Sequence, residues 1–120
     1  MANELSHSIS ISYSKGTAPS DNVSRSESTT TTISGTAWQG GRQTIGTTEE
    51  QIAKGDVATI GYVYVRNMDA TNYVEIGVVT GQYSIRLPAG KDCWFYSNGN
   101  TLFARANTAA VDIAYTIFSA

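Results

Sequence analysis

The stretch 62–87, YVYVRNMDATNYVEIGVVTGQYSIRL, decides the fold class of this chain. It holds three runs rich in β-branched and aromatic residues, 62–65, 73–79 and 83–87, with Asn, Asp, Thr and Gly between them. The β-branched and aromatic residues favour strands, and Asn, Asp and Gly favour turns. Residues 62–65 also place large apolar side chains on both faces, which is typical of a central strand covered on both sides. The stretch therefore predicts successive β-strands joined by short turns.

The same pattern continues to the C-terminus. Residues 93–96, 102–106 and 111–117 are further predicted strands, and the last run has Val111, Ile113, Tyr115 and Ile117 on one face. Many short strands with turn residues between them are typical of an antiparallel sandwich or barrel. The chain has 120 residues, a length that suits one domain. We therefore expect an all-β fold: one antiparallel β-sandwich over residues 1–120, in the form of a jelly roll of eight or nine short strands.

The first 35 residues are rich in Ser and Thr and have their own pattern. Leu5, His7, Ile9, Ile11 and Tyr13 alternate with serines, which predicts a half-buried strand. Residues 15–23 have the composition of a loop, and residues 24–34 are predicted to form an edge strand. Two arrangements remain open: the two strands pair with each other inside the domain, or they pair across a subunit or capsid boundary.

The segment 37–55 holds two local signals. Gly40 and Gly41 stand between 37–38 and 44–45, a pattern that predicts a two-residue hairpin turn. Thr47 followed three residues later by Glu50 resembles a capping box, and Gly55 would end the helix that it opens after two turns. We expect one turn of helix here, or an irregular strand.

Composition and charge argue against two classes of partner. The formal net charge is -2 and the pI is about 5.2, so no basic surface is expected to hold a nucleic acid. Charged residues make up 15% of the chain, whereas Ser and Thr supply 28 of its 120 positions. The N-terminus has no pattern of an export signal, and the longest nearly apolar run, 109–118, is too short for a membrane helix. We expect neither nucleic acid nor membrane as a partner.

No residue pattern indicates catalysis. A thiol nucleophile needs a base, and His7, the only histidine, lies on the apolar face of its strand, so Cys93 is expected to be a small buried hydrophobe. Glu49 and Glu50 are adjacent, so their side chains diverge and do not suit a glycosidase pair. Nothing in the sequence selects a distant carboxylate pair such as Glu75 and Asp112. We therefore predict that the chain is not an enzyme and has no catalytic residues.

Metal and cofactor sites are not indicated either. Residues 67–72, NMDATN, offer oxygen donors that suit calcium. The segment lacks the Gly and the terminal Glu of a hand-type calcium loop, and Asn and Asp are also ordinary turn residues, so a turn is favoured. We expect no metal and no cofactor.

Aromatic residues are the remaining candidates for a binding site. Trp38, Trp94 and Tyr96 have flat apolar faces and polar tips that suit stacking on sugar rings in a carbohydrate-binding module. In a sandwich, most such residues lie in the core or at a subunit interface, and we favour that role.

From residue 44 onwards the chain resembles small β-sandwich virion proteins of tailed bacteriophages. The resemblance rests on IGTTEE (45–50), DVATIGY (56–62), RNMDATNYVEIG (66–77), LPAG (87–90) and FARANTAAVD (103–112). It covers about two thirds of the chain, and the Ser/Thr-rich first third is less distinctive. It implies a structural part of the virion, made in the host cytoplasm, with no catalytic residues: a capsid decoration (cement) protein, or else a small neck or tail component.

A decoration protein gains its affinity for the capsid lattice from several weak contacts made by a symmetric oligomer. We therefore expect self-association, as a trimer, and binding to the major capsid protein or other virion proteins. The residues predicted to make these contacts are Leu5, His7, Ile9, Ile11, Tyr13 and Trp38.

Overall fold

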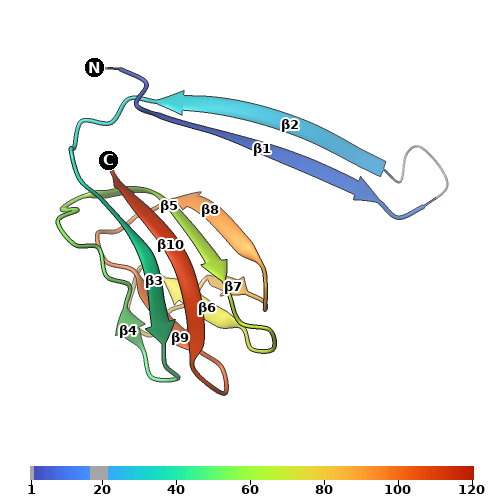
Figure 1. Cartoon of the computed structure of the whole chain (residues 1–120), viewed down its shortest axis with the longest axis vertical. Coiled ribbons are helices and arrows are strands. Elements are labelled where there is room, and N and C mark those ends of the chain that lie inside the picture. Colours follow the sequence, from blue (N-terminus) through green and yellow to red (C-terminus); the bar gives the residue numbers. More distant parts are fainter. Residues whose placement is uncertain (1, 17–21) are drawn as a thin grey trace. The chain divides into compact units, whose positions relative to one another are not determined.

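The computed structural model describes residues 2–16 and 22–120 and consists of β-strands, turns and loops in these residues (Figure 1). The sequence predicts one domain over the whole chain, whereas the structure divides into two compact units, Met1–Ser34 and Gly35–Ala120. Among the described residues, no helix is long and apolar enough to span a bilayer. The sandwich is therefore confined to the second unit, and each unit is described by itself.

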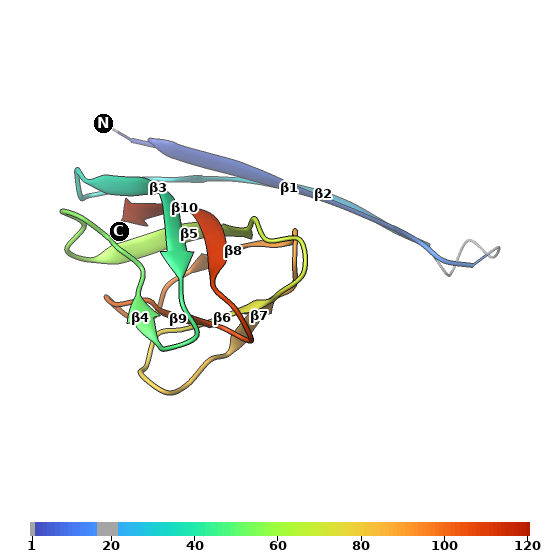
Figure 2. The same cartoon turned by 60° about the horizontal axis from the view of Figure 1, so that its bottom comes forward.

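The unit Gly35–Ala120 is a sandwich of two four-stranded antiparallel sheets, which lie as two layers in Figure 2. This architecture confirms the all-β antiparallel sandwich that the sequence predicts. The first sheet has the order β3 (Trp38–Ile45), β10 (Val111–Ser119), β5 (Ile60–Asn67), β8 (Asp92–Tyr96). The second sheet has the order β4 (Glu50–Gln51), β9 (Phe103–Ala106), β6 (Val74–Gly77), β7 (Ile85–Leu87).

The eight strands of the sandwich pair in a nested order. The first pairs with the last, β3 with β10, and then β4 with β9, β5 with β8 and β6 with β7. The pairs β10–β5 and β9–β6 complete the two sheets. Eight strands in two Greek keys form a jelly roll, and we interpret the nested pairing in this way.

The core lies between the two sheets. It consists of the inward-facing residues, which are alternate residues along the strands. In β10 the burial alternates along the strand, with Val111, Ile113, Tyr115 and Ile117 buried and Asp112 exposed. This period of two is the one expected when only one face of a strand lies on a core. The other buried apolar residues are Ile45, Ile52, Val57, Ile60, Val63, Val65, Val74, Ile76, Leu87, Leu102, Ala104 and Ala106.

One buried polar residue, Asn67 at the end of β5, joins two turns of the sandwich. Its side-chain Nδ2 donates to the carbonyl oxygens of Asn72 (2.9 Å) and Leu87 (3.0 Å), and its Oδ1 accepts from the N–H of Asp69 (2.8 Å). Its backbone N–H donates to the carbonyl of Lys91. A buried amide is stable only when its polar atoms are paired, and these bonds also hold the turns after β5 and after β7.

One of the two local predictions for the segment 37–55 differs from the structure. Gly40 and Gly41 do not form a turn: they lie inside β3, opposite Thr116 and Tyr115 of β10. Gly41 has a φ of 141°, a conformation that favours glycine without ending the strand. The long apolar strand β10 offers a continuous partner over all eight residues of β3, and this pairing overrides the local turn signal. The segment after Gly46 contains the short strand β4 and no helix, so of the two alternatives the irregular strand is the one formed.

The first unit is an antiparallel hairpin of β1 (Leu5–Ser14) and β2 (Asn22–Thr31), which pair over ten residues without a register shift. Both predicted N-terminal strands are present, although β2 begins at Asn22 inside the predicted loop 15–23 and ends before Ser34. Residues 17–21 of that loop lie outside the described residues. The strands pair with each other in a two-stranded sheet and join neither sheet of the sandwich.

Candidate interaction surfaces

The hairpin has two chemically different faces, which follow from its register. One face carries hydroxyl groups and one amide: Ser6, Ser8, Ser10, Ser12 and Ser14 lie opposite Thr30, Ser28, Ser26, Ser24 and Asn22. The other, which we call the hairpin apolar face, carries Leu5, His7, Ile9, Ile11 and Tyr13 opposite Thr31, Thr29, Glu27, Arg25 and Val23. Residues directly opposite in an antiparallel pair point to the same side of the sheet. The five residues predicted from the alternation of β1 therefore lie on one face.

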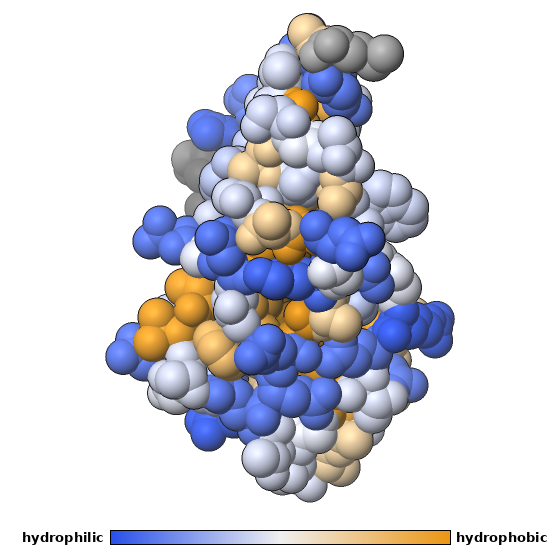
Figure 3. Space-filling model, turned by 90° about the vertical axis from the view of Figure 1, so that its left-hand side faces the viewer, coloured by the Kyte–Doolittle hydropathy of each residue, from blue (hydrophilic) through white to orange (hydrophobic). Residues whose placement is uncertain are grey.

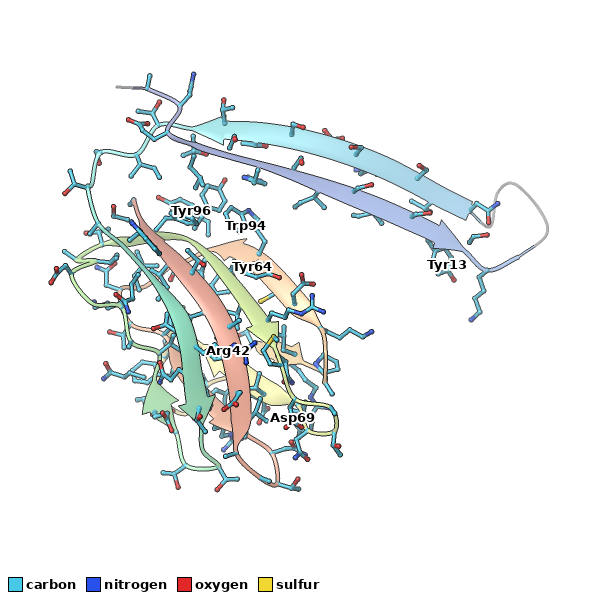
Figure 4. All side chains as sticks on the ribbon, viewed as in Figure 1. Tyr13, Arg42, Tyr64, Asp69, Trp94 and Tyr96 are labelled. Atoms are coloured by element: carbon cyan, nitrogen blue, oxygen red, sulfur yellow. The ribbon has the colours of Figure 1, made fainter. Side chains whose placement is uncertain are left out.

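The side chains of the hairpin apolar face are more exposed than those of a core. Ile9 is 42% exposed, Ile11 48%, Tyr13 51% and Val23 50%, whereas the isoleucines of β10 are fully buried. Tyr13 is seen projecting from the far end of β1 in Figure 4. Contiguous exposed apolar residues mark interaction sites more often than scattered ones. The hairpin apolar face is the first candidate interaction surface.

A second candidate lies on the outer side of the first sheet of the sandwich. Register places six aromatic residues on this side, and we call them the aromatic face: Trp38, Tyr62, Tyr64, Trp94, Tyr96 and Phe118. They come from all four strands of the sheet, β3, β5, β8 and β10. Figure 4 shows three of them, Tyr64, Trp94 and Tyr96, on the same side of β5 and β8.

Four rings of the aromatic face are in contact: those of Tyr62, Trp94, Tyr96 and Phe118. Tyr62 stacks on Trp94, with ring centroids 5.0 Å apart and an interplanar angle of 13°. The edge of Tyr96 meets the Tyr62 ring at 5.0 Å, and Trp94 meets Phe118 at 6.3 Å. Offset-stacked and edge-to-face pairs at these distances are attractive. Trp38 and Tyr96 are nevertheless 66% and 57% exposed, so the aromatic face is not fully buried.

Gly40 gives Trp38 its position on β3. A Cβ atom at residue 40 would lie 3.1 Å from the Trp38 ring and 3.1 Å from the Tyr115 carbonyl oxygen. A glycine within a strand often marks such a close approach. The signal that resembles a turn in the sequence thus lets an exposed tryptophan lie along the sheet.

Polar groups border the aromatic face. The Tyr64 hydroxyl donates to Asp92 Oδ2 at 3.0 Å, and Arg66 lies 4.0 Å from the same oxygen. Arg66 and Asp92 are both about half exposed, so this ion pair contributes little to stability. Its role fits a polar rim beside an apolar surface.

Next to the second sheet, the Glu49 side chain binds the loop between β6 and β7. Glu49 accepts hydrogen bonds from the Thr80 and Tyr83 hydroxyls and, at 2.7 Å, from the Gly81 N–H. These bonds, the one from Thr80 first, lower the pKa of the Glu49 carboxyl, and the bond to Glu49 raises the pKa of Tyr83. The guanidinium of Arg105 lies 4.4 Å from the Tyr83 ring centre. All of these groups are paired with protein neighbours, and the arrangement holds a loop in place.

The carboxylates considered as catalytic pairs lie on different segments. Glu50 accepts from the Gly46 N–H and from Gln43 Nε2, whereas Glu49 binds the loop between β6 and β7. Glu75 of β6 pairs with Arg105 at 3.1 Å. Asp112 lies on the other sheet, in β10, and accepts from Thr44. The structure brings neither pair together around a shared site.

Two further residue sets have structural roles in the sandwich. Burial, with Asp92 as the second cause, raises the pKa of the Cys93 thiol to about 11, so the thiol is protonated at neutral pH. In the segment 67–72, Asp69 Oδ2 accepts from the backbone N–H groups of Thr71 and Asn72, and these bonds lower its pKa. This is the turn that the sequence favours. Among residues 2–16 and 22–120, no group of three His, Cys, Asp or Glu side chains could hold a metal ion.

One side of the sandwich, in the lower part of Figure 3, carries hydrophilic side chains between smaller hydrophobic areas. The sequence predicts only part of the aromatic face. Trp38, Trp94 and Tyr96 are candidates in the sequence, whereas Tyr62, Tyr64 and Phe118 are not. Tyr62 and Tyr64 alternate with Val63 and Val65. This alternation could have predicted that the two tyrosines lie on the face of the strand away from the core.

The chain matches no known family model, and comparisons with curated proteins and with solved structures likewise give no match.

Proposed function

We propose that this protein is a structural component of a bacteriophage virion: a capsid decoration protein that binds and stabilises the capsid lattice as an oligomer. The observation that carries the proposal is the two-faced hairpin of ten regular strand pairs, on which Ile9, Ile11, Tyr13 and Val23 are about half exposed. A sheet of two strands is at best marginally stable alone in water, so a hairpin of this length gains stability from a partner. The sequence resemblance of residues 44–120 to small virion proteins of tailed bacteriophages supports the choice of a phage virion.

In this proposal the two units have different roles. The sandwich is the folded body, and the hairpin is the attachment arm, through its apolar face and through the main-chain groups along its outer strand edges. The partners are the major capsid protein or other virion proteins and further copies of this chain, with a trimer as the expected oligomer. The role is binding rather than catalytic. The alternative is a structural role in the neck or tail of the same particle.

The copy number in the particle tests this proposal. We expect hundreds of copies in purified intact virions, because a decoration protein occupies repeated positions on the lattice. Quantitative mass spectrometry of purified particles, with the major capsid protein as the internal standard, gives the ratio. A handful of copies would assign the chain to the neck or tail, and its absence from the particle would overturn the proposal.

The aromatic face favours a second candidate, carbohydrate binding, because Trp38 and Tyr96 are exposed beside polar groups that suit sugar hydroxyls. The stacking of Tyr62 on Trp94 argues against it, since each ring covers a face of the other. We favour a protein interface for this surface.

Tryptophan fluorescence separates the two interpretations. We expect host-surface oligosaccharides to leave the emission of the full chain unchanged, because Tyr62, Trp94 and Tyr96 already pack on one another. Trp38→Ala is the matched variant, as Trp94 remains the reporter within the same cluster. A saturable change in emission that Trp38→Ala abolishes would place carbohydrate binding first.

A further inference from the structure

The hairpin apolar face carries two charges of opposite sign, side by side on one strand. Arg25 and Glu27 both lie on this face, opposite Ile11 and Ile9 respectively, and both are exposed. The face therefore has a row of mainly apolar side chains along β1. At the middle of β2 it has one cation and one anion.

We propose that two copies of the chain associate by packing their hairpin apolar faces together, antiparallel, about a two-fold axis level with Ser10 and Ser26. In this arrangement β1 lies on β1 of the second copy, and β2 lies on β2. Ile9 of each copy meets Ile11 of the other, and Arg25 of each meets Glu27 of the other. The contact is isologous, so each pairing occurs twice.

The charges select this position of the axis. An axis level with Ile9 and Glu27 would place the two Glu27 side chains against each other, and one level with Ile11 and Arg25 would oppose the two arginines. Like charges that face each other across a sheet interface are unfavourable. Only the intermediate level pairs opposite charges on β2 and isoleucines on β1.

The charges also exclude a parallel arrangement. A two-fold axis along the strands would place β1 on β2 of the second copy, so that Ile9 would face Glu27 and Ile11 would face Arg25. Both isoleucines would then lie against charged groups, and both charges would lose water without an opposite charge in return. The antiparallel arrangement leaves the charge pairs at the rim, where they remain hydrated.

The size of the face predicts a weak contact. Ten residues at about 3.4 Å each form a face about 34 Å long, and two strands give it a width of about 10 Å. The area that two such faces bury is below the roughly 1,200 Å² of a standard stable interface. The opposite face of the hairpin carries Ser, Thr and Asn and stays in water. The pairing fills the hairpin apolar face, so in the proposed virion role the outer strand edges of the hairpin remain for contacts with virion proteins.

Charge reversal in the full chain tests the pairing. Arg25→Glu and Glu27→Arg each replace two attractive contacts with two repulsive ones, so each variant should associate about tenfold to a hundredfold more weakly. In an equimolar mixture of the two variants, every facing pair is again of opposite sign. The mixture should therefore form complexes that contain equal numbers of the two variants, with an affinity close to that of the unchanged chain. Sedimentation velocity gives the affinities, and native mass spectrometry gives the composition.

Two controls separate the pairing from general charge effects. The reversals change the net charge in opposite directions, so a net-charge effect would weaken one variant and strengthen the other. Ser26→Glu adds an acid to the same strand on the hydroxyl face and should leave association unchanged. Circular dichroism of each variant shows whether the strands are retained, which is expected because residues 25 and 27 are exposed.

Three outcomes would overturn the proposal. One is association that neither single reversal weakens, and another is a mixture that associates no better than the single variants. The third is a mixed complex with a two-to-one composition, which would indicate a three-fold packing of hairpins in place of the two-fold one. A full chain that shows no association in solution would overturn the proposal as well.

Discussion

Removal of residues 2–34 is expected to leave a folded sandwich that no longer binds phage heads. In the proposed virion role, one edge of the hairpin pairs with a neighbouring protein through four or five main-chain hydrogen bonds. At about 1 kcal/mol each, their loss costs on the order of 4 to 5 kcal/mol, which is more than a thousandfold in affinity. Co-sedimentation of the full chain and of the deletion variant with heads that lack this protein measures the change.

The deletion is interpretable because the sandwich contains none of the removed strands. Both four-stranded sheets lie within Gly35–Ala120, and the Gly35 N–H donates to the Ala120 carbonyl oxygen at 3.0 Å, inside that unit. Circular dichroism and a cooperative thermal transition serve as the control for folding. A folded deletion variant that binds heads with unchanged affinity would refute the role of the hairpin, and an unfolded one would refute the independence of the sandwich.

Ile113→Ala is expected to lower the free energy of unfolding of the sandwich by about 2 to 5 kcal/mol. Ile113 is 0% exposed and lies on β10, the strand between β3 and β5, in the centre of the first sheet. The shorter side chain loses contacts in the core and leaves a cavity that surrounding strands fill only in part. Urea unfolding followed by circular dichroism measures the difference.

Val79→Ala is the matched control for the core substitution. Val79 is 48% exposed, so its truncation should change the stability by less than about 0.5 kcal/mol. A loss of similar size in both variants would contradict the placement of the core between the two sheets.

The hairpin apolar face is the part of the candidate surfaces that could be predicted best. Leu5, His7, Ile9, Ile11 and Tyr13 alternate strictly with serines, and side-chain direction in a strand depends on position alone. The contribution of β2 could not be predicted in the same way. Which residues of β2 share this face depends on the register, and residue types alone do not set that register for a strand of Ser, Thr and single charges.

The aromatic face could be predicted only in part, because its members come from four strands. Trp38 and Phe118 are 80 positions apart in the chain and lie directly opposite each other in β3 and β10. Tyr62 and Tyr96, 34 positions apart, are opposite each other in β5 and β8. Such proximity results from the nested strand order, which no single stretch of the chain encodes.

The sequence by itself determined the class of this protein: short antiparallel strands, most of them with an apolar face, and a two-faced N-terminal strand. These are local properties, since alternation in a strand sends successive side chains to opposite sides. Only the tertiary structure decided the division into hairpin and sandwich, the place of Gly40 and Gly41 inside β3, and the gathering of the aromatic face. The physical reason is that strand pairing is settled by the partner that buries the larger apolar surface and satisfies the most main-chain groups, and that partner lies far away in the sequence.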